Sequence, residues 1–363
     1  MPGNQPLSAI GNRPIRVAMA GTGYVSPYHL KGWQHHQNLE IVALCAIDQA
    51  QAEARARQFG ISKVYARFEE MLDTEKPDVV DICTPAAVHP LQVKAAAARG
   101  IHVLCQKPLA DCLESARELA RITESAGVRL MIHENFRFRI WYRELKRRLD
   151  SGIIGRPYYC RSDARIGGTL PTAFSPDRPW ILKRHSHYAE VDKYLILESM
   201  IHQLDVCRFL FGDARQIYAR ARRISPFIKG EDLASLMVDF DGLHAVVERN
   251  YAARGHSPPP IVTEKVIVEG EKGSIFLEPN GSMRVEVDMP GDRKTIVPEY
   301  PVQDAYADSF AATIRHFVEC LRSGKPFETG PEDNLKTLSL TFAAYESIKT
   351  GKAIPLPRET EES

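Results

Sequence analysis

A glycine-rich turn near the start of the chain most narrowly limits its fold. Gly21-Thr22-Gly23-Tyr24-Val25-Ser26 lies between the apolar run Ile15–Ala20 and a helical stretch. The first glycine permits a tight turn, and the second lets the backbone come close to a ligand. Ser26 is small enough for the helix to pack closely on the strand. The pattern therefore predicts a buried strand, a turn and a helix.

This turn predicts a binding site for the pyrophosphate of a dinucleotide, because the free N–H groups and dipole of a helix start favour phosphate. The expected cofactor contacts come from Gly21, Gly23, Tyr24 and Val25. Asp48 ends the next apolar run, about 20 residues beyond the turn. A carboxylate there accepts hydrogen bonds from the ribose and repels a 2′-phosphate, which favours NAD over NADP. The alternative is that Asp48 only caps the following helix.

The first part of the chain alternates apolar runs with helical patterns, which predicts βαβ units and a parallel sheet. The expected strands are Ile15–Ala20, Leu39–Ile47, Asp78–Cys83, Ile101–Cys105 and Val128–Ile132. The expected helices between them include Gln49–Phe59, Pro90–Arg99 and Leu113–Ala126. We predict a Rossmann domain over residues 15–135, with ligands at the carboxyl ends of the strands.

The pattern changes after about residue 155 to strands joined by short turns such as Asp241-Gly242, which predicts a mainly antiparallel sheet. The expected strands are Tyr158–Ile166, Ala214–Ile224, Leu233–Phe240, Leu243–Tyr251, Thr263–Glu269, Ser274–Leu277, Met283–Val287 and Lys294–Val297. One helix, Leu195–Phe211, interrupts them, and Asp308–Arg322 and Glu332–Thr350 follow. We predict an α+β domain with a large open-faced sheet over residues 136–330. Residues 331–363 are expected to pack back on the first domain.

Chain length, net charge, apolar runs and cysteine content exclude several classes of protein. A chain of 363 residues suggests two domains, and a net charge of +1 gives no reason to expect nucleic acid or an anionic membrane as a partner. No apolar run is long enough to span a bilayer. Residues 1–14 have no apolar core of a signal peptide and are expected to form a disordered leader. The seven cysteines form no CxxC pair, which favours reduced thiols and a cytoplasmic protein.

Four further segments, taken with the glycine turn, resemble a known family. Cys105-Gln106-Lys107-Pro108 is similar to its E-K-P motif, and Glu198-x-x-x-His202-x-x-Asp205 to its D-x-x-x-H helix. Two further segments follow predicted strands at places where the family has motifs: Thr84-Pro85 with His89, and Glu134-Asn135-Phe136-Arg137. The chain thus resembles the Gfo/Idh/MocA oxidoreductases, which include inositol and glucose–fructose type dehydrogenases. The resemblance implies further cofactor contacts from Thr84, Pro85, His89, Gln106, Lys107 and Asn135.

Lys107 and His202 are the expected catalytic residues. A lysine at the carboxyl edge of the sheet can bond the substrate hydroxyl and the nascent carbonyl oxygen, although a solvent-exposed loop lysine is the plainer interpretation. Glu198 and His202 are four residues apart and share a helix face. On spacing alone, a surface pair or a core histidine is the better interpretation. The resemblance is what implies catalytic assistance by Lys107, acid/base work for His202 and substrate binding for Glu198.

Two residues depart from the family pattern, and other candidates rest on residue type. Gln106 stands where the family usually has Glu, and Glu198 where Asp is usual; both keep hydrogen-bonding capacity. Arg165 could bond a hydroxylated substrate and Trp180 could stack on a sugar ring. The alternatives are a surface arginine and a partly buried packing tryptophan. His185-Ser186-His187 offers two imidazoles but too few neighbouring ligands, so no metal site is expected.

The sequence therefore predicts an NAD-dependent dehydrogenase that oxidises a hydroxyl of a sugar, polyol or inositol, including C1 of an aldose to a lactone. The predicted substrate-binding residues are Lys107, Arg165, Trp180, Glu198 and His202. The resemblance implies a homodimer or homotetramer formed through the open sheet face. The alternatives are a non-catalytic NAD-binding sensor and an NAD-dependent glycoside hydrolase, in which oxidation is transient.

Overall fold

The computed structural model describes residues 13–173, 175–254, 264–287, 293–296 and 304–357. Two compact units divide the chain, with residues 1–135 and 307–335 in unit 1 and residues 136–306 and 336–363 in unit 2. Most of the predicted leader, residues 1–12, lies outside the described residues. Arg13, within the predicted leader, forms a bidentate ion pair with Asp78. No helix among the described residues is both long and apolar enough to cross a membrane.

Unit 1 contains a parallel sheet, and the described residues give it six strands in the order β3-β2-β1-β4-β5-β6. The strands are β1 (Ile15–Ala20), β2 (Leu39–Cys45), β3 (Val64–Tyr65), β4 (Val79–Ile82), β5 (His102–Gln106) and β6 (Leu130–His133). Each of β4 and β6 is buried along its whole length, because helices cover both faces of the sheet. The predicted Rossmann fold is therefore confirmed.

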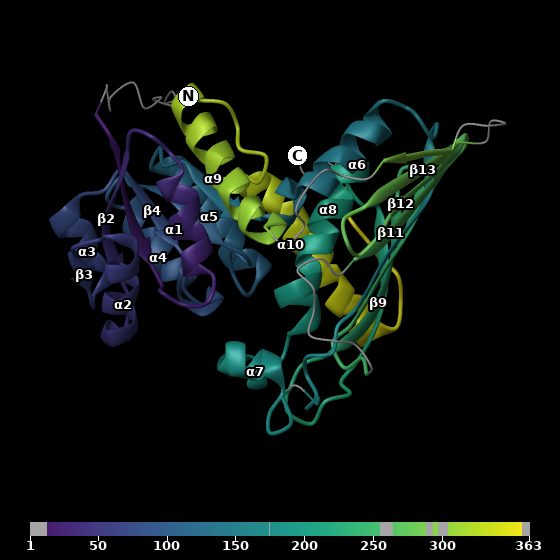
Figure 1. Ribbon diagram of the computed structural model, residues 1–363, viewed down its shortest axis with the longest axis horizontal. Coiled ribbons are helices and arrows are strands. Elements are labelled where there is room, and N and C mark those ends of the chain that lie inside the picture. The colour runs from purple at the N-terminus through teal and green to yellow at the C-terminus, as the bar shows by residue number, and fades with distance from the viewer. Residues whose placement is uncertain (1–12, 174, 255–263, 288–292, 297–303, 358–363) are drawn as a thin grey trace. The chain divides into compact units, whose positions relative to one another are not determined.

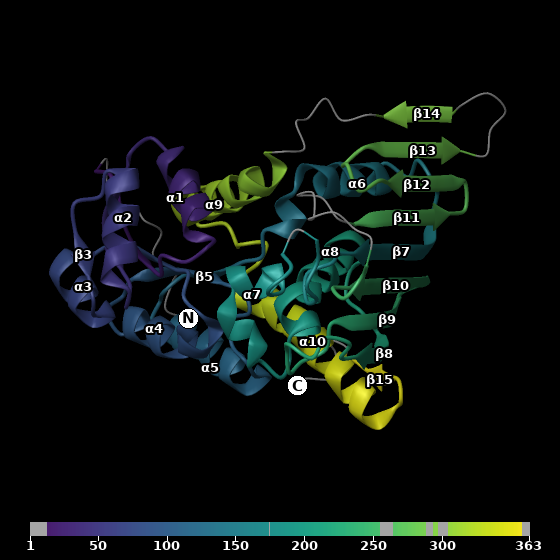
Figure 2. The same ribbon diagram turned by 60° about the horizontal axis from the view of Figure 1, so that its bottom comes forward.

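The helices of unit 1 pack on both faces of this sheet, as Figure 2 shows around β5. They are α1 (Ser26–Gln34), α2 (Gln49–Phe59), α3 (Phe68–Glu75), α4 (His89–Ala97) and α5 (Leu113–Ser125), with a short 3₁₀ turn η2 (Ala86–Val88) before α4. The sequence prediction did not identify β3 or α3. The two residues of β3 are too few to show an alternating pattern, and α3 is only two turns long.

A late segment of the chain completes unit 1. Helix α9 (Ala305–Ser323) lies beside α1 in both ribbon views (Figures 1 and 2). Phe317 of α9 packs edge-on against Trp33, and Phe310 packs against Tyr28. Residues 307–335 thus belong to unit 1, and residues 336–363 to unit 2. This differs from the predicted assignment of 331–363 to the first domain, because helical periodicity shows that a segment has an apolar face but not which core receives it.

Unit 2 contains the second predicted sheet. Its described strands have the order β14-β13-β12-β11-β7-β10-β9-β8-β15, as Figure 2 shows. They are β7 (Pro157–Arg165), β8 (Gln216–Arg222), β9 (Leu233–Phe240), β10 (Leu243–Asn250), β11 (Lys265–Gly270), β12 (Gly273–Leu277), β13 (Met283–Val287), β14 (Arg293–Ile296) and β15 (Ile354–Pro355). All the described pairs are antiparallel except β7 with β10. The predicted open-faced, mainly antiparallel sheet is confirmed.

Helices cover one face of this sheet, and Figure 1 shows α6 and α8 there. The helical elements of unit 2 are η3 (Phe136–Phe138), α6 (Ile140–Asp150), α7 (Trp180–Arg184), η4 (Ser186–Ala189), η5 (Leu195–Met200), α8 (Ile201–Phe211) and the later part of α10 (Pro331–Thr350). Leu204 and Cys207 of α8 share a buried core with Val247 of β10. The predicted helical segment Leu195–Phe211 is present in two parts, because its beginning is the π-helix η5 and the α-helix α8 starts at Ile201.

Candidate functional site

The predicted cofactor residues of unit 1 gather at one edge of its sheet. Parallel pairing brings the carboxyl ends of neighbouring strands together. Gly21 follows β1, Asp48 follows β2, Thr84 follows β4, Lys107 follows β5 and Asn135 follows β6. Residues far apart in the sequence are therefore brought to a common edge by the strand order alone.

The glycine turn has the backbone geometry that a pyrophosphate site requires. Gly21 has a φ of +96°, and a Cβ there would lie 2.5 Å from the Cys83 carbonyl oxygen. A Cβ on Gly23 would meet nothing within 4 Å, so the backbone is open on that side. Ser26 is fully buried and donates its hydroxyl to the Gly23 carbonyl. These features fit a phosphate group at the start of α1.

Asp48 has the helix-capping role that the sequence left open as the alternative to a ribose contact. It is the N-cap of α2, where its Oδ1 accepts a hydrogen bond from the Gln51 backbone N–H at 3.0 Å. Asp48 is exposed to solvent at the carboxyl edge of the sheet. Because a carboxylate has several acceptor positions, capping leaves capacity for the hydroxyls of a ribose.

The loop after β4 contains residues that support the segment carrying Lys107. His89 is fully buried, and its ring nitrogens lie 2.9 Å from the Pro108 carbonyl oxygen and 2.8 Å from that of Thr84. The Thr84 hydroxyl donates to Gln92. Pro85 precedes η2, and the Lys107–Pro108 peptide bond is cis. The imidazole of His89 therefore ties the turn after β4 to the turn after β5, and the half-buried Lys107 stands on a supported loop.

Gln106 belongs to a buried hydrogen-bond network in unit 1. His29 Nδ1 lies 2.8 Å from an oxygen of Asp81, to which Trp33 Nε1 also donates. Since a carboxylate only accepts, His29 donates from Nδ1 and its neutral ring accepts at Nε2. The Gln106 amide nitrogen lies 2.7 Å from that Nε2 and donates to it. An amide thus satisfies a neutral imidazole at the position where the family pattern has a carboxylate.

Cys83 completes a group of three residues whose ligand atoms are close enough to hold a metal ion, with His29 and Asp81. The Cys83 thiol donates to the second oxygen of Asp81. Burial, with the nearby Asp81 charge, raises the pKa of Cys83 well above its usual range. The hydrogen bonds within the network are therefore enough to explain why the ligand atoms of these three side chains lie close together.

Asn135 ends the loop after β6 and is buried. Its amide donates to the Ser309 hydroxyl of α9 at 2.7 Å. The sequence predicted a cofactor contact for Asn135; the structure shows that its side chain fixes the loop to the helix that completes unit 1.

In unit 2, Glu198 and His202 lie in consecutive helical segments. Glu198 is on the π-helix η5, half-buried, and its Oε2 accepts a hydrogen bond of 3.4 Å from the Tyr188 hydroxyl. His202 is in the first turn of α8 and is 9% exposed. π-Helical turns inside longer helices frequently occur at functional sites.

The other two predicted substrate residues have different surroundings. Trp180 opens α7, donates to the Gly167 carbonyl and packs against Gly168, so its indole supports that loop. Arg165 is exposed and pairs with Asp163 at the end of β7. Because Cys160 and Ala164 face the core, Arg165 projects from the opposite face to the one that α8 covers. The structure therefore does not bring Arg165 together with His202.

Sequence reasoning did not identify the partner of Asp205. Arg137 forms a buried bidentate ion pair with this carboxylate, with Nε–Oδ2 at 2.7 Å. Thr337 also donates to Asp205. Arg137 stands in the Glu134–Arg137 segment that carries the resemblance, but 68 residues separate it from Asp205. No local spacing could reveal this pairing.

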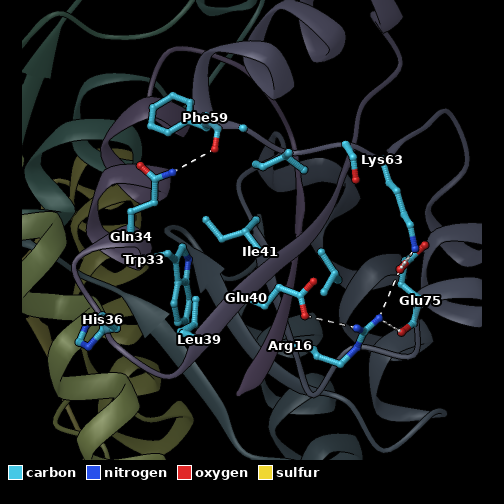
Figure 3. Close-up of a pocket in the computed structure, with 14 residues that line it drawn as sticks. Arg16, Trp33, Gln34, His36, Leu39, Glu40, Ile41, Phe59, Lys63 and Glu75 are labelled. Carbon is cyan, nitrogen blue, oxygen red and sulfur yellow. Dashed lines mark hydrogen bonds and ion pairs between the residues drawn. The ribbon is translucent and has the colours of Figure 1, made fainter. Parts of the chain in front are cut away.

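A depression of about 390 Å³ lies at the opposite edge of the sheet in unit 1 (Figure 3). Trp33 and Ile41 are among its apolar residues, and Arg16 pairs there with Glu40 and Glu75. Arg16 is at the amino end of β1, and Glu40 at that of β2. The depression is therefore at the far end of the strands from the glycine turn and is not the predicted cofactor site.

The chain matches two family models. Residues 15–134 match the model described as "Oxidoreductase family, NAD-binding Rossmann fold", and residues 142–276 match the "GFO/IDH/MocA C-terminal domain". This chain belongs to the Gfo/Idh/MocA oxidoreductase family. Membership makes it an NAD-dependent oxidoreductase of the class that acts on CH–OH groups.

Curated relatives and solved structures in the family are similar along nearly the whole chain. D-apiose dehydrogenase from Paraburkholderia graminis is 34% identical, covering 94% of this chain and 90% of the relative. scyllo-Inositol 2-dehydrogenase (NAD(+)) from Bacillus subtilis is 27% identical, covering 94% and 96%. An oxidoreductase from Agrobacterium radiobacter, solved in complex with NAD+, L-tartaric acid and magnesium, has a TM-score of 0.84 and 29% identity, covering 94% and 98%.

Replacing Asp48 separates its predicted ribose contact from its capping role. Asp48→Ser keeps an N-cap acceptor but removes the charge, whereas Asp48→Ala removes both. We expect both variants to raise the Kd for NAD⁺ about tenfold and to bind NADP⁺ more tightly than the wild type does. Only Asp48→Ala should also lower the melting temperature. Titration calorimetry with both cofactors measures this, and unchanged cofactor preference in Asp48→Ser would contradict the ribose contact.

Replacing Gln106 by Glu tests the neutral network. The variant removes the amide N–H that donates to Nε2 of the buried His29 and puts a carboxylate in its place, so two acceptors face each other. We expect the melting temperature of Gln106→Glu to fall by several degrees, which thermal unfolding measures. The exposed control Gln58→Glu should melt with the wild type, and an unchanged melting temperature in Gln106→Glu would refute the network.

Proposed function

We propose that this protein oxidises a hydroxyl of a small sugar, polyol or inositol, with D-apiose as the first candidate substrate. The similarity to D-apiose dehydrogenase over nearly the full length of both chains carries this proposal. The fit of the glycine turn and Asp48 to NAD supports it. An aldose that is oxidised at C1 would give a lactone, and a ring hydroxyl would give a keto sugar.

Lys107 and His202 are the proposed catalytic residues. Bound NAD⁺ supplies the acceptor for the hydride that leaves the carbinol carbon. The Lys107 ammonium would donate hydrogen bonds to the substrate oxygen and stabilise the negative charge that develops there. His202 would take the hydroxyl proton as a general base, so the products are a carbonyl compound, NADH and a proton. Glu198 would accept hydrogen bonds from a second substrate hydroxyl.

The proposed roles of the supporting residues follow from their positions. Gly21, Gly23, Tyr24 and Val25 would hold the pyrophosphate, and Asp48 the ribose. Thr84, Pro85, His89, Gln106 and Asn135 surround or support the edge at which the nicotinamide end would bind. Trp180 supports its own loop through Gly167, and it stays a proposed sugar contact. All seven cysteines are free thiols, which supports a reducing, cytoplasmic environment.

Alanine variants of Lys107 and His202 test the chemistry. A screen of sugars and polyols with NAD⁺, followed at the NADH absorbance, should find D-apiose or a related compound as substrate. With that substrate, we expect Lys107→Ala and His202→Ala to lower kcat by about 100- to 10,000-fold. The controls Lys94→Ala and His35→Ala change a lysine paired with Glu118 and an exposed histidine at the end of α1, and should keep wild-type kcat.

The two alternative functions give different results in the same screen. A sensor would bind NAD⁺ tightly without turnover, and Lys107→Ala would change nothing. An NAD-dependent glycoside hydrolase would release an aglycone from a glycoside without net NADH. Either result would refute the proposed dehydrogenase.

We also propose that two or more copies associate through the open face of the sheet in unit 2, as a dimer or tetramer. Met237 on β9 is 45% exposed on this face, and Arg161 of β7 pairs there with Glu248 of β10. An exposed apolar side chain on the same face as an ion pair suits a self-complementary interface.

Sedimentation velocity at micromolar concentration tests the association. We expect a dimer or tetramer for the wild type and a shift toward monomer for Met237→Glu, because a charge would be buried at the interface. Leu91→Glu is the matched control, since Leu91 is 71% exposed on α4 of unit 1. A monomeric wild-type protein would refute the proposal.

A further inference from the structure

His202 is stacked on an aromatic ring. The ring centroids of His202 and Phe136 are 4.1 Å apart, and the ring planes differ by 5°. Phe136 begins the 3₁₀ turn η3, immediately after the segment that leads out of unit 1, and its side chain is buried. A histidine ring otherwise turns broadly about its second side-chain torsion. The parallel stack restricts this rotation and fixes the plane in which the two imidazole nitrogens lie.

The opposite face of Phe136 carries a buried cation. The guanidinium carbon of Arg139 lies 3.3 Å from the centroid of the same ring. Two groups so close to one centroid would overlap if they shared a face, so Arg139 and His202 must lie on opposite faces. Phe136 is therefore held between a guanidinium and an imidazole, and it cannot tilt without losing both contacts.

A buried carboxylate fixes the guanidinium in turn. Glu264 is fully buried and lies 3.2 Å from Arg139 and 2.7 Å from Arg249. It also accepts a hydrogen bond from Gln203, the residue after His202 on α8. Burial favours a raised pKa for Glu264, but the charges of Arg139 and Arg249 outweigh it and the pKa is lowered. The ionised carboxylate thus links the cation under Phe136 to the helix that carries His202.

We infer that Phe136, held in place by Arg139 and Glu264, is a positioning residue that orients the His202 imidazole for proton transfer. The inference rests on the proposed function, in which His202 is the general base. Catalytic groups act efficiently only within narrow limits of position, and a displacement of about 1 Å can cost about 100-fold in rate. The stack acts on the orientation of a side chain, so it should influence kcat more than the affinity for substrate or NAD⁺.

The test compares Phe136→Leu, which removes the flat ring but stays apolar, with Phe136→Tyr, which restores a ring. We expect Phe136→Leu to lower kcat about 10- to 100-fold, with KM and the Kd for NAD⁺ within about threefold of the wild type. Phe136→Tyr should recover most of the lost kcat. The kinetic isotope effect with substrate deuterated at the oxidised carbon should rise in Phe136→Leu, because the chemical step becomes rate-limiting.

Phe209→Leu is the matched control. Phe209 lies on α8 two turns beyond His202, and its ring packs against the guanidinium groups of Arg137 and Arg143. We expect this variant to keep wild-type kcat. If Phe136→Leu does not fold, Phe136→Met replaces it, since its flexible thioether fills the space without a flat face.

The outcomes separate this inference from the proposed function. Wild-type kcat in His202→Ala would refute the general base, and the inference with it. An inactive His202→Ala together with wild-type kcat in Phe136→Leu would refute the inference alone. A parallel loss of kcat, NAD⁺ affinity and thermal stability in Phe136→Leu, without recovery in Phe136→Tyr, would make Phe136 a purely structural residue and would also refute it.

Discussion

Parallel pairing of the strands in unit 1 is the constraint on which the candidate site depends. Every neighbouring pair in this sheet is parallel, so all its strands end at one edge. The glycine turn, Asp48 and Lys107 are separated widely in the sequence, but each directly follows or lies close beyond a strand end. Short loops after the strands therefore form the cofactor-binding edge of the sheet, and the helices on both faces keep the strands in register.

Buried polar networks stabilise the catalytic candidates in both units. The network in unit 1 is built around neutral side chains, and the network in unit 2 around charged ones. In unit 1, the neutral amide of Gln106 satisfies a neutral His29, whose other nitrogen donates to Asp81. In unit 2, the Glu264 carboxylate bridges Arg139 and Arg249. A buried polar group without a partner is costly, so each network restricts its members to one arrangement. Lys107 adjoins the first network, and His202 stacks on the ring that the second supports.

The sequence predicted the fold well where local patterns report tertiary structure. Strands such as Ile15–Ala20 and Leu233–Phe240 coincide with the structure, because burial on one or two faces leaves a clear apolar pattern. The π-helix at Leu195–Met200 could not be predicted, since a spacing of four residues suits either kind of helix. Arg139 and Glu264 are 125 residues apart, and only the folded chain shows that they meet. For the same reason, the sequence did not show that most of α9 belongs to unit 1.

The most direct test of the central claim follows the hydride itself. The substrate found by screening would carry deuterium at the carbon that is oxidised, and the reduced cofactor would be analysed by mass spectrometry after a single turnover. A dehydrogenase of the proposed kind gives one deuterium in NADH for each carbonyl product formed. Product without deuterated NADH, or tight binding of NAD⁺ without any product, would contradict the account.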